Sequence, residues 1–278
     1  MLGSFESRII GKRGDVPRVD SAPKELAGNH TASGEYRLPG PFYCFAGNLL
    51  LRAVRWLPSR LRRHYVRGRR GYQTFSEAEL VDQEGLSIKK WEALQMPADL
   101  SKKSVLDVGC SEGFFCRQAA KNGAGPVVGL DTGLGRLICA SSIALEEGLN
   151  IRYRRAVFPR RLPRGKYDYV LCLSVLHHSL STRDLWKVLA LDEFAEDRLV
   201  LRRQLRVLRE LTADGGKCVV EMPYEYDNPA EREEVDFERF NAELTGAGFS
   251  RARCLGSWDY NPKFKQMKDR IIYVADAG

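Results

Sequence analysis

Short apolar runs alternate with helical patterns through the middle of the chain. The runs at 105–108 and 127–130 have the length and branched side chains of buried strands, and 151–153 is predicted to be a shorter third strand. Between the second and third runs, residues 135–147 follow a helical pattern that Gly148 ends. Strands that alternate with helices in this way predict an open, mainly parallel sheet of the α/β class.

Two more helices and two more strands are expected toward the C-terminus. The first helical pattern covers 182–211 and the second runs from 236 to 244, before Gly246. The first has an apolar face among its charged residues, made of Leu199, Leu205, Leu208 and Leu211. The stretches 250–255 and 270–275 are the two expected strands.

A helical extension precedes the sheet. An apolar stripe at helical spacing runs through 42–66, and Pro58 is expected to break that helix. Ser76 and Glu79 match a capping box, so a further helix is expected to begin there. Trp91 lies on another short helical pattern.

The composition divides the chain into three parts. Residues 1–40 are rich in Gly, Ser, Pro and charge and have no apolar periodicity, which predicts a disordered or loosely attached tail. Residues 41–100 form the helical extension, and residues 101–278 are long enough for one α/β domain with a substantial core.

The positive charge lies in front of the α/β domain. The chain has a formal net charge of +8, and residues 1–75 hold fourteen Lys or Arg against five Asp or Glu. From Arg52 to Arg70 there are eight arginines and neither an acidic residue nor a lysine. This segment fits three roles: packing on the sheet with its arginines in water, binding RNA phosphates, or lying on an anionic membrane surface.

Several classes of protein are disfavoured. The sequence has no run of eighteen apolar residues that would span a bilayer, and its first residues do not follow the pattern of a secretory signal. Its seven cysteines include no Cys-x-x-Cys pair, which disfavours a disulfide framework and a zinc site. We therefore expect no metal, and a cytoplasmic protein that can be peripheral at a membrane.

The turn after the first strand carries the main chemical signal. It reads Asp107-Val108-Gly109-Cys110-Ser111-Glu112-Gly113, and the second strand ends at Asp131. Such a strand–turn–helix–strand–acid unit holds an adenosine cofactor, with the acid on the ribose diol. The carboxylates of Asp107 and Glu112 would repel a pyrophosphate but suit an ammonium and a sulfonium, so S-adenosylmethionine is favoured over NAD.

This turn strongly resembles motif I of the class I, Rossmann-like, S-adenosylmethionine-dependent methyltransferases, and the resemblance extends over residues 100–277. It implies a three-layer sandwich whose seven-stranded sheet is mostly parallel with the last strand antiparallel. Strand four is placed at 167–173, and strand five at 217–222 after the turn at Gly215-Gly216. The implied cofactor contacts are Asp107, Gly109, Cys110, Glu112, Gly113, Phe114, Asp131, Thr132, Val157 and Ser174.

One family contact is missing. After the third strand the family often has an acid for the adenine amino group, whereas this chain has Ala156-Val157-Phe158-Pro159. We expect a backbone amide to contact the adenine edge there, with Val157 or Phe158 beside the ring.

The candidate catalytic residues follow strands four and five. His177 or His178 is a candidate general base for a hydroxyl, although such a histidine can instead orient its loop. Glu221 is an alternative proton acceptor. The candidate substrate contacts are Tyr72, Trp91, Tyr224 and Tyr226, each of which can also have an ordinary packing or loop role.

The acceptor is less sharply defined than the donor. The loop after strand four lacks the Asn-Pro-Pro-Tyr or Asp-Pro-Pro-Tyr motif of enzymes that methylate base amines, which favours an oxygen nucleophile. O-methylation of a small molecule, glycan or lipid is the leading expectation. A weaker similarity to the methyltransferases of wobble uridine in tRNA makes an RNA substrate, bound by the arginine-rich extension, the first alternative. A catalytically inactive RNA-binding or partner subunit is the second.

Overall fold

Seven strands form a single sheet in the order β3-β2-β1-β4-β5-β7-β6. The computed structural model describes residues 41–67, 86–160, 162–176, 195–223, 237–259 and 269–278. Strand β7 runs antiparallel to both of its neighbours, and the other pairings are parallel. The predicted fold class is therefore confirmed. The strands are β1 (Val105–Val108), β2 (Val127–Asp131), β3 (Ile151–Arg155), β4 (Tyr167–Leu173), β5 (Thr212–Pro223), β6 (Arg251–Asp259) and β7 (Asp269–Asp276).

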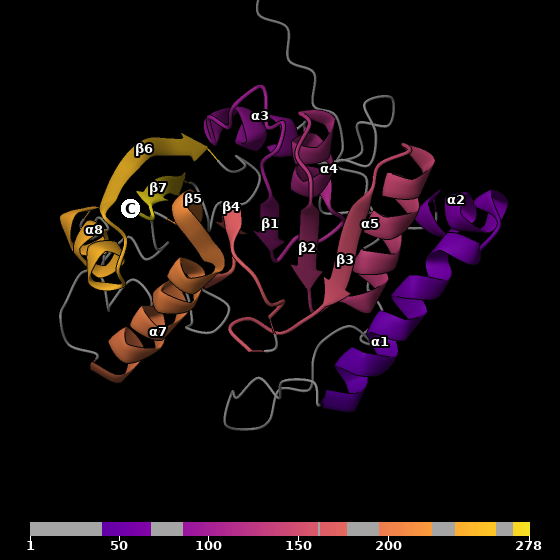
Figure 1. The fold of residues 1–278 in the computed structure, drawn as a ribbon, viewed down its shortest axis with the longest axis horizontal. Coiled ribbons are helices and arrows are strands. Elements are labelled where there is room, and N and C mark those ends of the chain that lie inside the picture. Colours follow the sequence, from indigo (N-terminus) through magenta and orange to yellow (C-terminus); the bar gives the residue numbers. More distant parts are fainter. Residues whose placement is uncertain (1–40, 68–85, 161, 177–194, 224–236, 260–268) are drawn as a thin grey trace, which may run out of the picture. The chain divides into compact units, whose positions relative to one another are not determined.

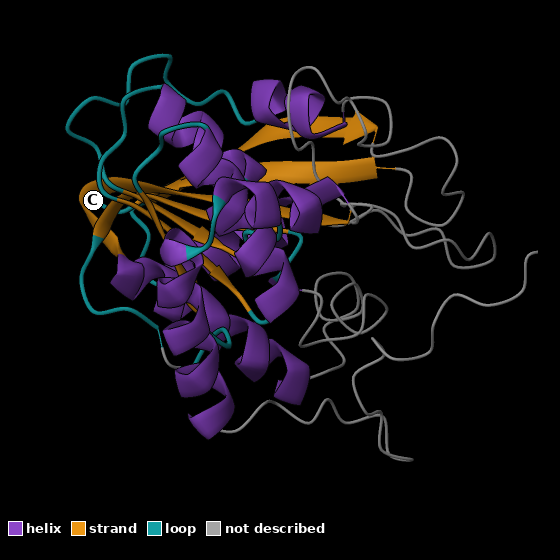
Figure 2. Ribbon diagram, turned by 90° about the vertical axis from the view of Figure 1, so that its right-hand side faces the viewer, coloured by secondary structure: helices purple, strands orange, loops and turns teal. Residues whose placement is uncertain are grey.

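Helices cover both faces of this sheet (Figures 1 and 2). Helices α7 and α8 belong to one face, and α3, α4 and α5 belong to the other. Their bounds are α3 (Leu86–Ala93), α4 (Phe114–Lys121), α5 (Leu134–Glu146), α7 (Ala195–Leu211) and α8 (Phe237–Gly246). These helices agree with the helical patterns of the sequence within the described residues.

Two apolar cores, one on each face, follow from the alternation of side chains along the strands. In β4, Val170 packs into the core under α7 and α8, and Leu171 packs into the core under α3, α4 and α5. In β1, Leu106 likewise packs into the core under α7 and α8, and Val105 packs into the core under α3, α4 and α5. Because successive strand residues point to opposite faces, continuous apolar runs are what a sheet covered on both sides requires.

The expected break at Pro58 separates two helices. Helix α1 (Pro41–Ala53) continues through the short 3-10 helix η2 (Val54–Trp56), and α2 (Ser59–Arg67) begins after Pro58. Both helices lie beside α5 (Figure 1), and α1 also contacts β3. Glu146 of α5 accepts hydrogen bonds from Ser59 at 2.8 Å and from Arg62 at 2.8 Å. The extension therefore packs on the sheet domain through one of its faces.

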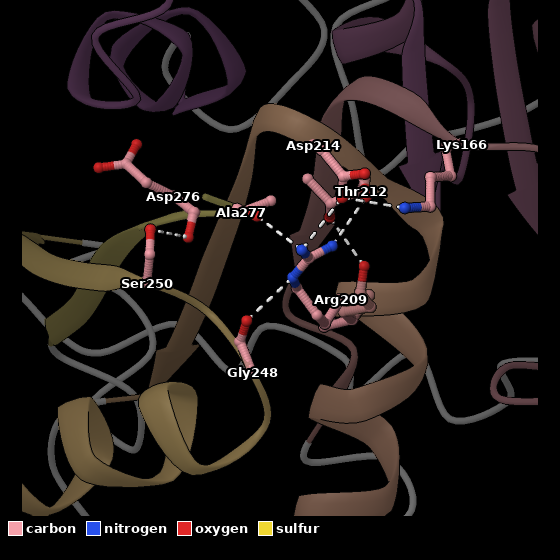
Figure 3. Close-up of polar contacts among 9 residues, drawn as sticks. Lys166, Arg209, Thr212, Asp214, Gly248, Ser250, Asp276 and Ala277 are labelled. Atoms are coloured by element: carbon pink, nitrogen blue, oxygen red, sulfur yellow. Dashed lines mark hydrogen bonds and ion pairs between the residues drawn. The ribbon is translucent and has the colours of Figure 1, made fainter.

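Arg209, near the end of α7, joins several segments at the amino edge of β5 (Figure 3). Its guanidinium donates to the carbonyls of Thr212, Gly248 and Ala277 at 3.2, 3.0 and 2.6 Å. It also pairs with Asp214 at 3.1 Å. One side chain thus connects α7, β5, the turn after α8 and the last residues of the chain.

The sequence-based boundaries were wrong at β5. Glycines 215 and 216 were predicted to form the turn before this strand, but β5 already begins at Thr212, which pairs with Tyr167. The register between β4 and β5 shifts beyond Tyr167, and Gly215 there adopts a φ of +74°. Glycine permits this irregularity inside a strand because it adopts a positive φ at little conformational cost.

Some predictions fall outside the described residues. These are the tail at 1–40, the helix expected at Ser76 and the first part of the helix at 182–211. The three-part division of the chain stays a prediction, and the structure groups residues 39–278 in one unit. None of the helices within the described ranges is long and apolar enough to cross a membrane.

Candidate cofactor and active site

The turn between β1 and α4 depends on two glycines with positive φ. Gly109 has a φ of +79° and Gly113 a φ of +76°. A Cβ at Gly109 would collide with the side chain of Val175, and one at Gly113 would collide with the hydroxyl of Tyr153. Both the backbone conformation and the close approach therefore require glycine at these two positions. The result is a tight turn at the carboxyl edge of the sheet, where open α/β folds bind their ligands.

Asp131, the last residue of β2, is held against this turn. Its Oδ2 accepts the backbone N–H of Ser111 at 3.0 Å, and its Oδ1 accepts that of Gly133 at 2.7 Å. Two amide donors fix the orientation of the carboxylate, which has further lone pairs to accept hydrogen bonds from a ribose diol. The ribose-binding role of Asp131 stays a prediction.

The two carboxylates of the turn differ in environment. Asp107 points from β1 toward α4, is 1 % exposed, and accepts a hydrogen bond from the Cys116 thiol at 3.4 Å. Burial raises the pKa of Asp107 to about 7. Glu112 is also buried and accepts a hydrogen bond from the Ser111 hydroxyl at 2.5 Å. Acidic groups in a buried turn fit a cofactor that carries positive charge.

The residues that follow β2 and β3 complete this edge. Thr132 is exposed, and its carbonyl accepts a hydrogen bond from Arg155 Nε at 2.8 Å. Val157 is buried, and its carbonyl accepts the N–H of Arg160 at 2.6 Å, which closes a short turn. Phe158 is half-buried in the same turn. Apolar side chains thus stand where the family often has an acid.

A buried polar cluster lies at the carboxyl ends of β4 and β5. Glu221 is 0 % exposed, and its Oε2 accepts a short hydrogen bond from Ser174 and pairs with Lys90 Nζ at 3.0 Å. Arg270 of β7 lies on the other side, with its Nε 3.8 Å from Glu221 Oε1. We call Lys90, Ser174, Glu221 and Arg270 the buried ionic cluster.

Charge within this cluster is set by burial and by neighbouring ions. Burial alone would raise the pKa of Glu221, but Lys90 and Arg270 hold this pKa below its usual value. Burial lowers the pKa of Lys90, and the attraction of Glu221 offsets only part of that effect. Glu221 is therefore an ionised, weakly basic carboxylate.

The buried ionic cluster adjoins the glycine turn. Val175, the residue after Ser174, packs over Gly109, and the ammonium of Lys90 lies 5.7 Å from the centre of the Phe115 ring. Trp91 is half-buried and packs with Phe115, their ring centres 6.5 Å apart. The structure therefore brings the predicted residues Ser174, Glu221 and Trp91 to the same edge as the cofactor turn.

Sequence reasoning missed Lys90, Arg155 and Arg270. None of them belongs to a motif, and each acquires its partner only through contacts between distant segments. These residues are distinguished by the burial of their charge, and a single sequence does not show which arginines and lysines are buried. His177, His178, Tyr72, Tyr224 and Tyr226 lie outside the described residues, so their predicted roles stay predictions.

Residues 105–192 match a family model described as a methyltransferase domain. Among curated proteins, the chain is 42 % identical over 78 residues to the ubiquinone biosynthesis O-methyltransferase of Erwinia tasmaniensis, covering 27 % of this chain and 32 % of that protein. It is 38 % identical over 84 residues to the enzyme of the same name from Saccharophagus degradans, covering 29 % and 35 %. The matched segment thus spans about a third of the length of these relatives.

Solved structures share the fold at low identity. The bifunctional kinase-methyltransferase WbdD superposes with a TM-score of 0.51 at 20 % identity, over 78 % of this chain and 46 % of that one. Phosphoethanolamine N-methyltransferase 2 of Haemonchus contortus, solved with S-adenosyl-L-methionine, gives 0.51 at 13 % identity, over 71 % and 54 %. Residues 105–192 therefore carry a methyltransferase domain, in a sheet whose order and glycine turn are those of the class I, Rossmann-like fold.

Proposed function

We propose that the protein transfers a methyl group from S-adenosylmethionine to an oxygen of a small-molecule, glycan or lipid acceptor. The observation that carries this proposal is the turn at Gly109 and Gly113, with the Asp131 carboxylate fixed beside it by the N–H groups of Ser111 and Gly133. This arrangement combines close backbone approach, a ribose acceptor and acidic surroundings in one place.

Each predicted site residue would have a role that follows from its chemistry. Asp131 would bind the ribose hydroxyls of the cofactor, and Val157 would pack beside its adenine. Asp107 and Glu112 would attract its positively charged ammonium and sulfonium groups. The bound cofactor supplies an electrophilic methyl group on a sulfonium, and transfer of this methyl group leaves a neutral thioether. His177 or His178 would take the proton of the acceptor hydroxyl. Because Glu221 is buried and ion-paired, its structure supports a positioning role for this residue in preference to proton transfer.

Two observations support oxygen as the acceptor atom. The segment after β4, Ser174-Val175-Leu176, lacks the Pro-Pro-Tyr signature of base-amine methyltransferases. The curated relatives named above are O-methyltransferases by name. We propose a cytoplasmic location, and RNA methylation and an inactive partner subunit remain as outcomes of the test.

Isothermal titration with S-adenosylmethionine tests the cofactor site. We expect Asp131→Asn to weaken binding at least ~10-fold, because a neutral amide is a poorer acceptor for the ribose diol. Asp168→Asn is the matched control: Asp168 also accepts a backbone N–H, from Ser104 at 2.9 Å, but at the amino edge of the sheet. Equal affinities in all three proteins, or no binding by the wild type, would contradict the proposal.

Turnover and the acceptor class need a second measurement. Labelled S-adenosylmethionine is incubated with the protein and with fractionated cell extract, and we expect label in the small-molecule, glycan or lipid fraction. Label confined to RNA would show that the acceptor is RNA and contradict the proposed acceptor class. Cofactor binding without label in any fraction would identify an inactive module.

A further inference from the structure

Helix α1 has two apolar faces: among the described residues, one packs on the protein and the other is exposed. The packed face consists of Cys44, Gly47, Leu51 and Val54, which are all buried. On the opposite face, four large apolar side chains stand 60 to 82 % exposed: Phe42, Phe45, Leu49 and Trp56. A helix that only packs on its own domain shows a polar outer face, so this second stripe requires an explanation.

The exposed residues lie on one side of the helix. They occur at positions i, i+3, i+7 and i+14 of a helix that continues through η2, so they lie along one side of it. Leu57 and Leu61 extend the exposed apolar surface past Pro58 into α2. Three aromatic rings and a leucine thus lie exposed on one side of this helix.

Arginines flank these exposed apolar residues. Arg52, Arg55, Arg60 and Arg63 are exposed, and the sequence has no acidic residue between Glu35 and Glu77. Arg62 pairs with Glu146 of α5 on the side that faces the domain. The outward surface therefore combines exposed aromatic groups with exposed guanidinium groups.

We propose that this surface, which we call the α1 face (Phe42, Phe45, Leu49, Trp56 and the arginines 52, 55, 60 and 63), binds an anionic phospholipid bilayer. Aromatic and leucine side chains insert at the boundary between headgroups and acyl chains, and guanidinium groups bind lipid phosphates. A second copy of the chain fits less well, because pairing two such faces would bring arginines against arginines. RNA would use the arginines and aromatic rings but not Leu49, Leu57 and Leu61.

The α1 face starts next to the candidate cofactor edge. Asn48 of α1 exchanges hydrogen bonds with the backbone of Arg155 at 2.7 and 3.1 Å, and Arg155 donates to Thr132, the residue after Asp131. A protein docked through α1 would thus hold this edge near the membrane. This step rests on the proposed function and indicates an acceptor that resides in or on the bilayer, whereas docking itself does not depend on methyl transfer.

Vesicle flotation with the full chain tests the docking. We expect binding to vesicles of phosphatidylcholine with phosphatidylglycerol, and little binding to phosphatidylcholine alone. The triple variant Phe42→Ser, Phe45→Ser, Trp56→Ser should lower the partition coefficient at least ~10-fold, because it removes most of the inserted apolar surface. The matched control is Leu199→Ser on α7, which is 64 % exposed and should bind like the wild type.

A charge variant separates the electrostatic contribution to vesicle binding from the contribution of the inserted apolar side chains. Changing arginines 52, 55, 60 and 63 to Gln should abolish the preference for anionic vesicles. Wild-type protein that does not float, or a triple variant that floats equally well, would overturn the proposal. RNA binding or self-association that the triple variant loses, without vesicle binding, would assign the α1 face to those partners instead. Titration with S-adenosylmethionine should give the wild-type affinity in the triple variant, so failure of docking and failure of the cofactor site are distinguishable.

Discussion

At the scale of single residues, Asp107 shows how burial makes a carboxyl group sensitive to neutral pH. The side chain is 1 % exposed, and its hydrogen-bond donor is the Cys116 thiol, a weak one. Water does not stabilise its charged form, so the pKa rises to about 7. Lys90 is close enough to oppose this shift but does not cancel it. The group therefore changes charge within the range in which cells work.

We expect the affinity for S-adenosylmethionine to fall as pH falls through about 7. If the ionised form of Asp107 attracts the positive groups of the cofactor, lowering the pH from 8 to 6 should weaken binding about 10-fold. Titration calorimetry at pH 6, 7 and 8 measures this effect, and Asp107→Asn should flatten it. The same slope in Asp107→Asn would assign the pH dependence to another group.

The raised pKa of Asp107 affects stability in the opposite direction: the unfolding free energy falls as pH rises. Because the pKa of Asp107 in the folded protein is raised above its ordinary value, the folded state binds this proton more tightly than the unfolded chain does. The ionisation of Asp107 therefore lowers the unfolding free energy as pH rises from about 4 to about 7, and the loss is complete above that range. The unfolding free energy of Asp107→Asn should exceed that of the wild type by more at pH 8 than at pH 5.

At the scale of helices and strands, local patterns predicted most elements, and long-range pairing was beyond them. The period of apolar positions placed α5, β1, β2 and β3 to within about two residues, because periodicity is a local property. The start of β5 was misplaced because it depends on pairing with Tyr167 of β4. The ion pair of Lys90 with Glu221 was missed for the same reason, since it joins α3 to β5.

That ion pair makes the attachment of α3 to the sheet depend on charge balance. Changing Glu221 to Gln would leave Lys90 and Arg270, which are both buried, without the carboxylate between them. Removal of one partner from a buried ion pair costs about 3 kcal/mol or more of unfolding free energy. Urea denaturation at pH 7 measures this loss for Glu221→Gln.

Glu243 provides the matched control for this measurement. Its carboxylate is buried too, but its partners Arg198 and Arg202 are 29 % and 45 % exposed. Water can solvate those arginines after Glu243→Gln, so we expect a loss nearer ~1 kcal/mol. Equal losses in the two variants would show that burial of the cations does not determine the cost.

At the scale of the whole described unit, Arg155 connects the N-terminal helix to the candidate cofactor site. Gly47 allows α1 to approach closely, since a Cβ there would lie 2.6 Å from Arg155 Cδ. The guanidinium of Arg155 stacks on Tyr43 at 3.5 Å and donates to the Thr132 carbonyl at 2.8 Å. Asp131 precedes that carbonyl, so a ligand that orders residues 131–133 also orders the anchor of α1.

We expect S-adenosylmethionine to slow amide hydrogen exchange in α1, by about 5-fold or more, although the cofactor would not contact most of this helix. Arg155→Met keeps part of the apolar packing but removes the bond to Thr132, so it should abolish this protection and weaken cofactor binding. Arg62→Met is the control: it removes the contact of Arg62 with Glu146, keeps that of Ser59, and should leave the protection of α1 intact. If α1 exchanges equally fast with and without the cofactor, the contact through Arg155 transmits no ordering. The methyltransferase site and the α1 face would then act independently, and a membrane would bring the protein to its acceptor without altering its affinity for the cofactor.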